Sequence, residues 1–442
     1  MMTQQEHRQE EVAEDLKQEM PAKEVKDGVE LSNPLEIVQR MLEVATQDLE
    51  LPQGVYEILK KPKRILKVSI PVRMDDGTYR EFEGYRSQHL DVLGPTKGGV
   101  RFHPGVTEDE VAALSIWMSM KAAILGIPYG GGKGGIVVNP KELSERELEE
   151  LSRGFIRELE PIMGPEKDIP APDVNTTPQI MGWMIDEFSR LKGKNVPGTI
   201  TGKPLILGGS EGRVEATGRG VVFTIEDAAK KLGLELEGMT AVVQGFGNVG
   251  SITAKLLHER GVKVLGIVDA GGGVYHKDGL PIEELIGYAQ TTGTVAGYNG
   301  YESLSNEELF AADVDILVPA ALENQITSTT GPTIRAKIVA EAANGPTTPD
   351  GNAAMEKNGI TVIPDILCNA GGVTVSYFEW VQNTTHLRWT EQEVNERLHT
   401  EMTDAFDDVY EMKEQKDCTM REAAYLVAVE RIAQAMEARG WI

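Results

Sequence analysis

The sequence has few cysteines and few aromatic residues, and its basic residues are outnumbered by acidic ones. Only Cys368 and Cys418 occur among 442 residues, and neither has the spacing of a metal site, so we expect reduced thiols and no metal. No run of about 18 apolar residues is present, which argues against a membrane span. The polar first residues lack the apolar core of a signal peptide, so a cytoplasmic protein is expected.

The charge imbalance narrows the possible partners. Acidic residues outnumber basic ones by 69 to 44, which gives a formal net charge of −25. This charge repels nucleic-acid phosphates and anionic lipids, so we expect no nucleic-acid partner and no membrane partner. Two explanations stay open: adaptation to high salt, in which surface carboxylates keep a protein dissolved, or an ordinary acidic bacterial protein.

A chain of this length is expected to form two main domains. Residues 1–32 are rich in Glu, Gln and Lys and predict an acidic, mobile tail. Residues 33–207 are expected to form the substrate-binding and oligomerisation domain. A hairpin is predicted there, with strands at 65–72 and 79–86 on either side of an Asp-Asp-Gly turn.

The second half of the chain has a different pattern. Residues 208–370 alternate short apolar strands with helices, which is typical of a parallel sheet covered by helices. The expected strands are at 240–244, 262–268, 316–318, 338–341 and 361–364. Residues 371–442 are predicted to be helical. The fold class is therefore α/β, with a Rossmann-type dinucleotide-binding domain, an α/β substrate domain and C-terminal helices that pack back on the substrate domain.

Three helix starts have the sequence of a capping box, in which a Ser or Thr is followed three residues later by Glu. These pairs are Thr107 with Glu110, Ser144 with Glu147, and Thr390 with Glu393. Each pair predicts that a helix begins at that point.

A glycine motif, GFGNVG at 245–250, stands between an apolar strand and an amphipathic helix. In this context Gly245 would allow the tight turn, Gly247 the approach of a pyrophosphate, and Gly250 the close packing of helix on strand. The start of the helix would offer free N–H groups to the phosphates. The residues expected to bind the pyrophosphate are Gly245, Gly247, Asn248, Val249 and Gly250.

Asp269 follows the next predicted strand, where an acidic side chain binds the adenosine ribose 2′-hydroxyl. Its charge would repel the 2′-phosphate of NADP. We therefore expect NAD or NADP as the coenzyme, with a slight preference for NAD. NADP stays open because Lys277 is a cation nearby in the sequence that could accept the phosphate.

Three lysines stand where lysine is not the usual structural residue. Lys97 lies beside glycines in GPTKGGVRFHP, Lys121 interrupts an otherwise apolar helix, and Lys133 lies in GGGKGG. The last segment is predicted to be a glycine loop that precedes an apolar strand at 136–138. A lysine in a dry pocket near other cations has a lowered pKa and can act as an acid–base group. A phosphate-binding P-loop would need Ser or Thr after the lysine, and Gly134 stands there.

A carboxylate is also available for proton transfer. Asp173 follows two prolines that restrict the backbone in PAPDVN, so the direction of its side chain would be fixed. For this motif alone, an Asp that caps a turn is the alternative interpretation.

The motifs together resemble the hexameric glutamate dehydrogenase family. The resemblance rests on GPTKGGVRFHP, the lysine of SMKAAI, YGGGKGG, PAPDVNT, RVEATGRG, GFGNVG and NAGGVTVSYFEW, and it covers the chain beyond residue 33. It implies an NAD(P)-dependent enzyme that reversibly deaminates L-glutamate to 2-oxoglutarate and ammonium. It also implies a homohexamer.

The resemblance implies roles for individual residues. Lys133 would be the catalytic lysine and Asp173 its partner in proton transfer. Lys97 and Ser376 would bind the side-chain carboxylate of the substrate, and Lys121 would bind its α-carboxylate. The other residues implied to line the substrate pocket are Gly98, Ala171, Asn369 and Val373.

On the coenzyme side, the resemblance implies that Arg213 and Thr217 lie near the nicotinamide. Thr217 would hold the carboxamide group of that ring.

Two other functions stay open at this point. A dehydrogenase for apolar amino acids would share the fold, but Lys97 would then be an unpaired charge beside an apolar side chain. A catalytically silent regulatory subunit or amino-acid sensor would be expected to have lost Lys133 or Asp173, and both are present.

Overall fold

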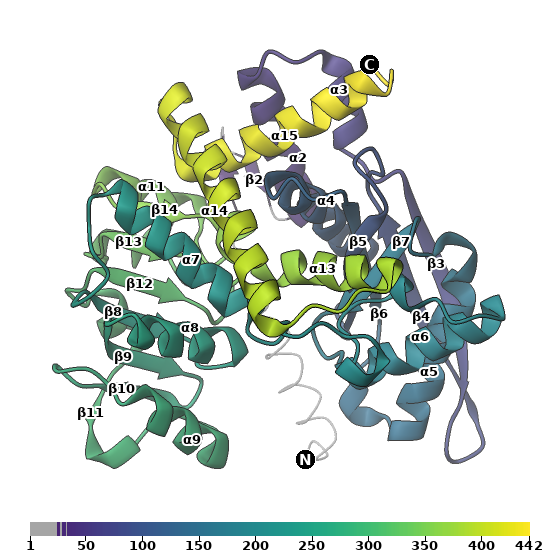
Figure 1. The fold of residues 1–442 in the computed structure, drawn as a ribbon, viewed down its shortest axis with the longest axis horizontal. Helices are drawn as coiled ribbons and strands as arrows, with labels where there is room; N and C mark the ends of the chain where they lie inside the picture. Colours follow the sequence, from purple (N-terminus) through teal and green to yellow (C-terminus); the bar gives the residue numbers. More distant parts are fainter. Residues whose placement is uncertain (1–23, 27–28, 32) are drawn as a thin grey trace, which may run out of the picture.

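The chain folds around two large β-sheets that lie side by side, with helices around and between them (Figure 1). The computed structural model describes residues 24–26, 29–31 and 33–442. Two short strands near the start, β1 (Glu24–Lys26) and β2 (Val29–Leu31), pair antiparallel. The rest of the predicted tail at 1–32 lies outside the described residues.

The first sheet has five strands in the order β3-β4-β6-β5-β7. The predicted hairpin is confirmed, because β3 and β4 pair antiparallel over their whole length. β5 runs parallel to both β6 and β7. The strands are β3 (Arg64–Arg73), β4 (Tyr79–Gln88), β5 (Thr96–Phe102), β6 (Gly130–Ile136) and β7 (Asp168–Pro172).

The predicted loop around Lys133, with a strand following at 136–138, is wrong. These glycines form β6, the middle strand of the sheet. Glycine is needed there because the helix α4 (Glu108–Ile124) packs directly on the strand. A Cβ on Gly131 would lie 1.9 Å from the carbonyl oxygen of Ser115 on that helix. Lys133 is therefore held by a buried strand.

Helices cover both faces of the five-stranded sheet. On one face α4 packs against β6. On the other face α5 (Glu145–Leu159) and α6 (Pro178–Lys192) contribute Phe155 and Met184 to a buried apolar cluster. The side chain of Lys133 is on the face covered by α4.

Two of the three predicted capping boxes are confirmed, those that begin at Ser144 and Thr390. The third forms only in part. Thr107 accepts a hydrogen bond from the backbone N–H of Glu110, but the Glu110 carboxylate pairs with Arg101 at 2.6 Å. A guanidinium competes well for this carboxylate because both partners of that hydrogen bond are charged, whereas the backbone N–H is neutral.

The second sheet has seven strands in the order β11-β10-β9-β8-β12-β13-β14. The five predicted strands are confirmed and run parallel, while β10 and β11 add an antiparallel edge. The strands are β8 (Thr240–Gln244), β9 (Lys263–Asp269), β10 (Gly272–Tyr275), β11 (Glu302–Ser303), β12 (Ile316–Pro319), β13 (Ile338–Ala340) and β14 (Thr361–Ile363).

Helices pack on both faces of this sheet as well, which gives the Rossmann-type arrangement. Leu256 and Leu285 belong to the apolar cluster on one face, and Phe310 and Met355 to the cluster on the other. The helices that carry the two clusters are α7 (Ala216–Lys231), α8 (Asn248–Glu259), α9 (Ile282–Thr292), α10 (Asn306–Phe310) and α11 (Pro349–Lys357).

The C-terminal helices join the two halves, as the sequence predicts. α14 packs on α7 of the second half, whereas α15 packs on α4 and α2 of the first half. In Figure 1 α14, in yellow-green, runs between the two sheets, and α15, in yellow, lies across the top of the view toward α3. The remaining helices are α2 (Pro34–Asp48), α3 (Gln53–Leu59), α12 (Asp365–Cys368), α13 (Gly371–Thr385), α14 (Glu391–Lys416) and α15 (Met420–Ala438).

Within the described ranges, no helix is both long enough and apolar enough to cross a membrane. The same residues contain no group of three or more His, Cys, Asp or Glu side chains arranged to hold a metal ion.

The close packing of β6 leads to a stability prediction. Gly131→Ala should lower the free energy of unfolding by about 3 kcal/mol, because the added methyl group overlaps the backbone of α4. The matched control is Gly287→Ala on the exposed face of α9, where an added Cβ meets nothing within 4 Å. That change should stabilise the protein by up to about 1 kcal/mol. Denaturant unfolding of both variants tests the contrast, and equal midpoints would contradict it.

Candidate active site

The sheet register places Lys97, Lys133 and Asp173 on one face of the five-stranded sheet. Lys97 on β5 is opposite Gly131 on β6 and Ile169 on β7. Side chains of a strand alternate between faces, so positions 131 and 133 share a face, as do 169 and 173. All three predicted site residues are therefore on the face that α4 covers.

Lys133 contacts Asp173 across the intervening strand β5. Gly99 allows this contact, because a Cβ at that position would lie 2.7 Å from Oδ2 of Asp173. The backbone of Asp173 is held by a hydrogen bond from its N–H to Oγ1 of Thr176 at 2.7 Å. Arg101 lies 3.5 Å from the other carboxylate oxygen of Asp173. A lysine and a carboxylate are thus held in contact across β5.

Burial changes the acidity of the lysines in this region. Burial, and then the nearby Arg101 guanidinium, hold the pKa of Lys133 well below its usual value. Burial, and then the charge of Arg213, lower the pKa of Lys97 to about 7. Burial also lowers the pKa of Lys121. Water is a better solvent for an ammonium group than a protein interior, so these amines lose protons more readily than exposed lysines do.

Lys121 links the two halves of the molecule. Its Nζ, on α4, donates a hydrogen bond to Oδ1 of Asn369 at 2.6 Å. Asn369 precedes α13 and donates from Nδ2 to Oδ1 of Asn344 at 2.9 Å and to the carbonyl oxygen of Ala343 at 3.2 Å. The two predicted substrate residues therefore meet, although 248 positions separate them in the sequence.

Ser376 and Arg213 form a second connection. Nε of Arg213 donates to Oγ of Ser376 on α13 at 3.2 Å. Arg213, predicted near the nicotinamide, also lies beside Gly372, where an added Cβ would be 3.6 Å from its Nη1, and its charge influences Lys97. Thr217 lies beside the start of α13, because a Cβ on Gly372 would be 2.7 Å from its Oγ1.

The other predicted pocket residues lie around the same groups. Ala171 on β7 is opposite Gly99 on β5, and it shares the face of Asp173. Gly98 contributes backbone to this strand pair, and Val373 is in the first turn of α13.

Two residues that sequence reasoning did not select support the site from the opposite face of the sheet. Arg86 and Asp168 are fully buried and form a bidentate pair, with N–O distances of 2.7 and 2.6 Å. Thr96 donates to Asp168 at 2.7 Å, and Arg86 donates to the carbonyl oxygen of Gly98 at 3.1 Å. The pair therefore ties β4, β5 and β7 together behind Lys97. Nothing in the local sequence distinguishes these two residues from surface charges.

The glycine motif has the geometry that a dinucleotide needs. Gly245 has a φ of 90°, and a Cβ on Gly250 would lie 2.0 Å from the carbonyl oxygen of Gly245, so both positions require glycine. An added Cβ on Gly247 meets nothing within 4 Å, which leaves open space at this turn. Asn248 and Val249 form the first turn of α8. Free N–H groups at a helix start beside open space suit a pyrophosphate.

Asp269 and Lys277 lie at opposite ends of β9. Asp269 is the last residue of β9. It lies at the carboxyl ends of the parallel strands, where the glycine turn follows β8. β10 runs back antiparallel, and the N–H of His276 donates to the carbonyl oxygen of Leu265 at 2.8 Å. Lys277 therefore lies beside the first half of β9. The possibility that Lys277 accepts an NADP phosphate next to Asp269 is wrong.

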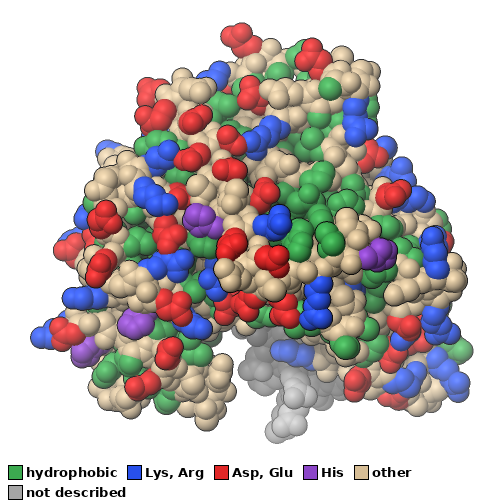
Figure 2. Space-filling view, in the orientation of Figure 1, with side chains coloured by type: hydrophobic (Ala, Val, Ile, Leu, Met, Phe, Trp, Pro, Cys, Tyr) green, Lys and Arg blue, Asp and Glu red, His purple; other side chains and the backbone are tan. Residues whose placement is uncertain are grey.

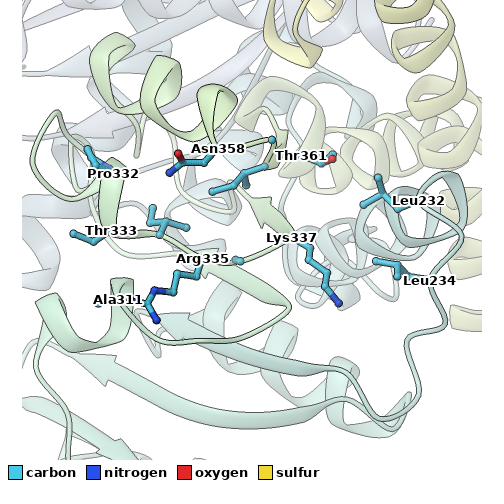
Figure 3. A pocket seen from close by; sticks show the side chains of 13 residues that line it. Leu232, Leu234, Ala311, Pro332, Thr333, Arg335, Lys337, Asn358 and Thr361 are labelled. Carbon is cyan, nitrogen blue, oxygen red and sulfur yellow. The ribbon is translucent and has the colours of Figure 1, made fainter.

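A cavity of about 840 Å³ lies at the amino-terminal ends of strands in the seven-stranded sheet (Figure 3). It is lined by Leu232 at the end of α7 and by Lys337 and Thr361, which precede or begin β13 and β14. Lys337 is already paired with Asp315 at 2.8 Å. The glycine motif follows the carboxyl end of β8, at the opposite ends of the strands. This cavity is therefore remote from the predicted coenzyme site.

Comparison with known families accounts for both halves of the chain. Residues 62–190 match the family profile described as Glu/Leu/Phe/Val dehydrogenase, dimerisation domain. Residues 208–440 match the profile of the Glutamate/Leucine/Phenylalanine/Valine dehydrogenases. The chain belongs to this family. The lysines and the aspartate lie in or next to the first profile, and the glycine motif lies in the second.

Individual members of the Glu/Leu/Phe/Val dehydrogenase family are similar over almost the whole chain. The cryptic catabolic NAD-specific glutamate dehydrogenase of Bacillus subtilis is 54% identical over 92% of this chain and 96% of its own. The NAD-specific glutamate dehydrogenase of Staphylococcus aureus is 52% identical over 93% of this chain and 99% of its own.

Solved structures of family members share the fold. Glutamate dehydrogenase from Peptoniphilus asaccharolyticus has a TM-score of 0.85 and 48% identity, over 93% of this chain and 100% of its own. A hetero-hexameric glutamate dehydrogenase from Thermus thermophilus, in a leucine-bound form, has a TM-score of 0.88 and 38% identity, over 95% of this chain and 99% of its own.

The buried charge of Lys97 leads to a pH-dependent prediction. Its pKa in the folded protein, about 7, is below its ordinary value of 10.5, so the protonated side chain opposes folding. The cost is fully present below pH 7 and disappears as the pH rises toward 10.5. Lys97→Met should therefore raise the Tm, by about 2–4 °C per kcal/mol gained, most strongly at and below neutral pH. Thermal unfolding at a series of pH values tests this, and an advantage that does not change with pH would contradict it.

Proposed function

We propose that this chain reversibly deaminates L-glutamate to 2-oxoglutarate and ammonium, with NAD as the hydride acceptor. The observation that carries the proposal is the contact of Lys133 with Asp173 on the face that also presents Lys97. The names of its relatives, NAD-specific glutamate dehydrogenases, agree with that chemistry.

The arrangement of cations suits a substrate with two carboxylates. Lys97, Arg213 and Ser376 would hold the side-chain carboxylate, while Lys121, supported by Asn369, would hold the α-carboxylate. An apolar amino acid would leave Lys97 and Arg213 as uncompensated buried charges, which is strongly unfavourable. Glutamate is therefore favoured over leucine, valine or phenylalanine.

Lys133 and Asp173 would move the protons of the reaction. The substrate reaches the enzyme as an ammonium ion, and its nitrogen must lose a proton before a hydride can leave Cα. Lys133, with its lowered pKa, would take that proton and pass it to Asp173. The same pair would then remove a proton from the water that attacks the resulting iminium carbon, and would protonate the departing amine.

The coenzyme would bind at the carboxyl ends of the parallel strands in the seven-stranded sheet. Gly245, Gly247 and Gly250, with the N–H groups of Asn248 and Val249, would hold the pyrophosphate. Thr217 would hold the nicotinamide carboxamide. When bound, NAD supplies the acceptor for the hydride. Two anchored carboxylates orient Cα toward it, and orientation of this kind can contribute about 7–11 kcal/mol to catalysis.

We also infer the organisation of the working enzyme. Residues 33–207 would bind substrate and form subunit contacts, 208–370 would bind NAD, and 371–442 would return to the first domain. A homohexamer with a cytoplasmic location is part of the same proposal, and the free thiols of Cys368 and Cys418 agree with a reducing compartment.

The surface is compatible with self-association and offers little to nucleic acid. The apolar segment 205–207 is exposed, with Ile206 at 92%, and would suit a subunit contact. Figure 2 shows acidic and basic side chains interspersed over the visible face, with hydrophobic side chains gathered right of centre.

The purified chain should reduce NAD in the presence of glutamate, and Lys133→Ala should lower kcat by at least about 100-fold because a general acid–base group is lost. The Kd for NADH should stay within about twofold, since the lysine lies outside the coenzyme site. Steady-state kinetics and NADH binding by fluorescence measure the two effects.

Lys141→Ala, at an exposed lysine near the end of β6, is the control and should change neither value. A wild-type chain that binds NADH but turns over no glutamate would favour a silent regulatory subunit. Equal losses of kcat and NADH affinity in Lys133→Ala would contradict the role of that lysine.

A further inference from the structure

The carboxylate of Asp269 is held by three hydrogen bonds from its own chain. Its Oδ1 accepts from the N–H of Gly271 at 2.8 Å and from Oγ1 of Thr294 at 2.7 Å. Its Oδ2 accepts from the N–H of Val295 at 2.7 Å. Asp269 is half-buried at the carboxyl end of β9, where the coenzyme would bind. The three bonds fix the orientation of its carboxylate there.

The hydroxyl of Thr294 takes part in two hydrogen bonds. It donates its proton to Oδ1 of Asp269 at 2.7 Å and accepts the N–H of Ala296 at 3.1 Å. The turn after β9 is closed tightly around this contact, because a Cβ on Gly271 would lie 2.3 Å from Oγ1 of Thr294. Thr294, 25 positions away in the sequence, thus connects the loop after α9 to the acidic residue.

The hydrogen bonds leave one acceptor direction for a ligand. A carboxylate oxygen has two lone pairs, and both lone pairs of Oδ1 are used. Oδ2 has one bond and one remaining lone pair, which can accept a ribose hydroxyl. A phosphate on the 2′ oxygen removes that donor and would bring like charge against a carboxylate held by three hydrogen bonds.

The surrounding sequence does not supply a compensating cation. Between Ala270 and Gly300 there is one lysine and no arginine. That residue, Lys277, lies beside the first half of β9, far from Asp269. The two loops that meet at Asp269 therefore offer no basic side chain of their own to a 2′-phosphate.

We propose that Thr294 is a positioning residue that makes Asp269 select NAD over NADP. The proposal rests on the proposed function, because it assumes that the dinucleotide binds with its adenosine ribose at the end of β9. Thr294 acts through Asp269: its hydroxyl holds Oδ1, so that Oδ2 faces the ribose hydroxyl.

The test measures the Kd of NADH and of NADPH, by quenching of protein fluorescence, for the full chain and three variants. Thr294→Val removes the hydroxyl and keeps the shape of the side chain. It should weaken NADH binding by about fivefold to tenfold, because an Asp269 carboxylate that is no longer held loses part of its hydrogen bond to the ribose, and it should change NADPH binding by less than about twofold. The preference for NADH should fall by the same factor.

Thr294→Ser keeps the hydroxyl and should retain the preference for NADH. Thr291→Val is the matched control, because within the described part of the chain that exposed hydroxyl donates to the carbonyl oxygen of Gly287 at 3.0 Å and bonds neither Thr294 nor Asp269. Its NADH-to-NADPH ratio should not change.

The outcomes separate this inference from the proposed function. If the wild-type chain binds NADH more tightly than NADPH and Thr294→Val keeps that ratio, or weakens both ligands equally, Thr294 has no selective role and the inference is wrong. If the wild-type chain binds neither dinucleotide, the proposed function itself is wrong.

Discussion

The contact between Lys133 and Asp173 depends on backbone that carries no side chains. Lys133 is on β6 and Asp173 follows β7, so the two groups can meet only across β5. Gly99 leaves the necessary space on β5, and Gly131 lets α4 close over the same strands. Glycine normally weakens a strand interior, and here it is needed because side chains from neighbouring elements occupy its place. The proposed chemistry thus depends on glycines that leave room on one face of the sheet.

Such a site is costly because it gathers cations away from water. Lys97, Lys133 and Arg213 all have pKa values lowered by burial. The surrounding fold must hold these groups in place, and it does so with buried ion pairs that take no part in the reaction. Arg86 pairs with Asp168 behind the sheet, and Lys203 pairs with Glu379 of α13 at 2.6 Å. The residual cost is compatible with function, because an anionic substrate would neutralise the excess positive charge.

The site residues connect two sheets, each of which has a separate apolar cluster on one of its faces. Lys121 of the first half meets Asn369 of the second, and α15 returns from the second half to pack on α4. A substrate anchored on the five-stranded sheet would thereby be held toward the carboxyl ends of the strands of the seven-stranded sheet, where the glycine turn lies. Movement of one half relative to the other would change the distance between these anchors, which suits an enzyme that excludes water during hydride transfer.

Local patterns in the sequence were enough to predict the α/β fold class, the hairpin, the parallel strands and the glycine turn. They also singled out Lys97, Lys121 and Lys133 as lysines in unusual surroundings. Each of these depends on neighbours within about ten positions, where periodicity and turn chemistry act. Only the tertiary structure decided that the glycines around Lys133 form a strand, that Glu110 turns to Arg101, and that Lys277 lies at the wrong end of β9.

The structure also identified the buried partners Arg86 and Asp168, which are 82 positions apart in the sequence. Strand order and register bring such residues together, and these are set by packing across the whole chain rather than by any single segment.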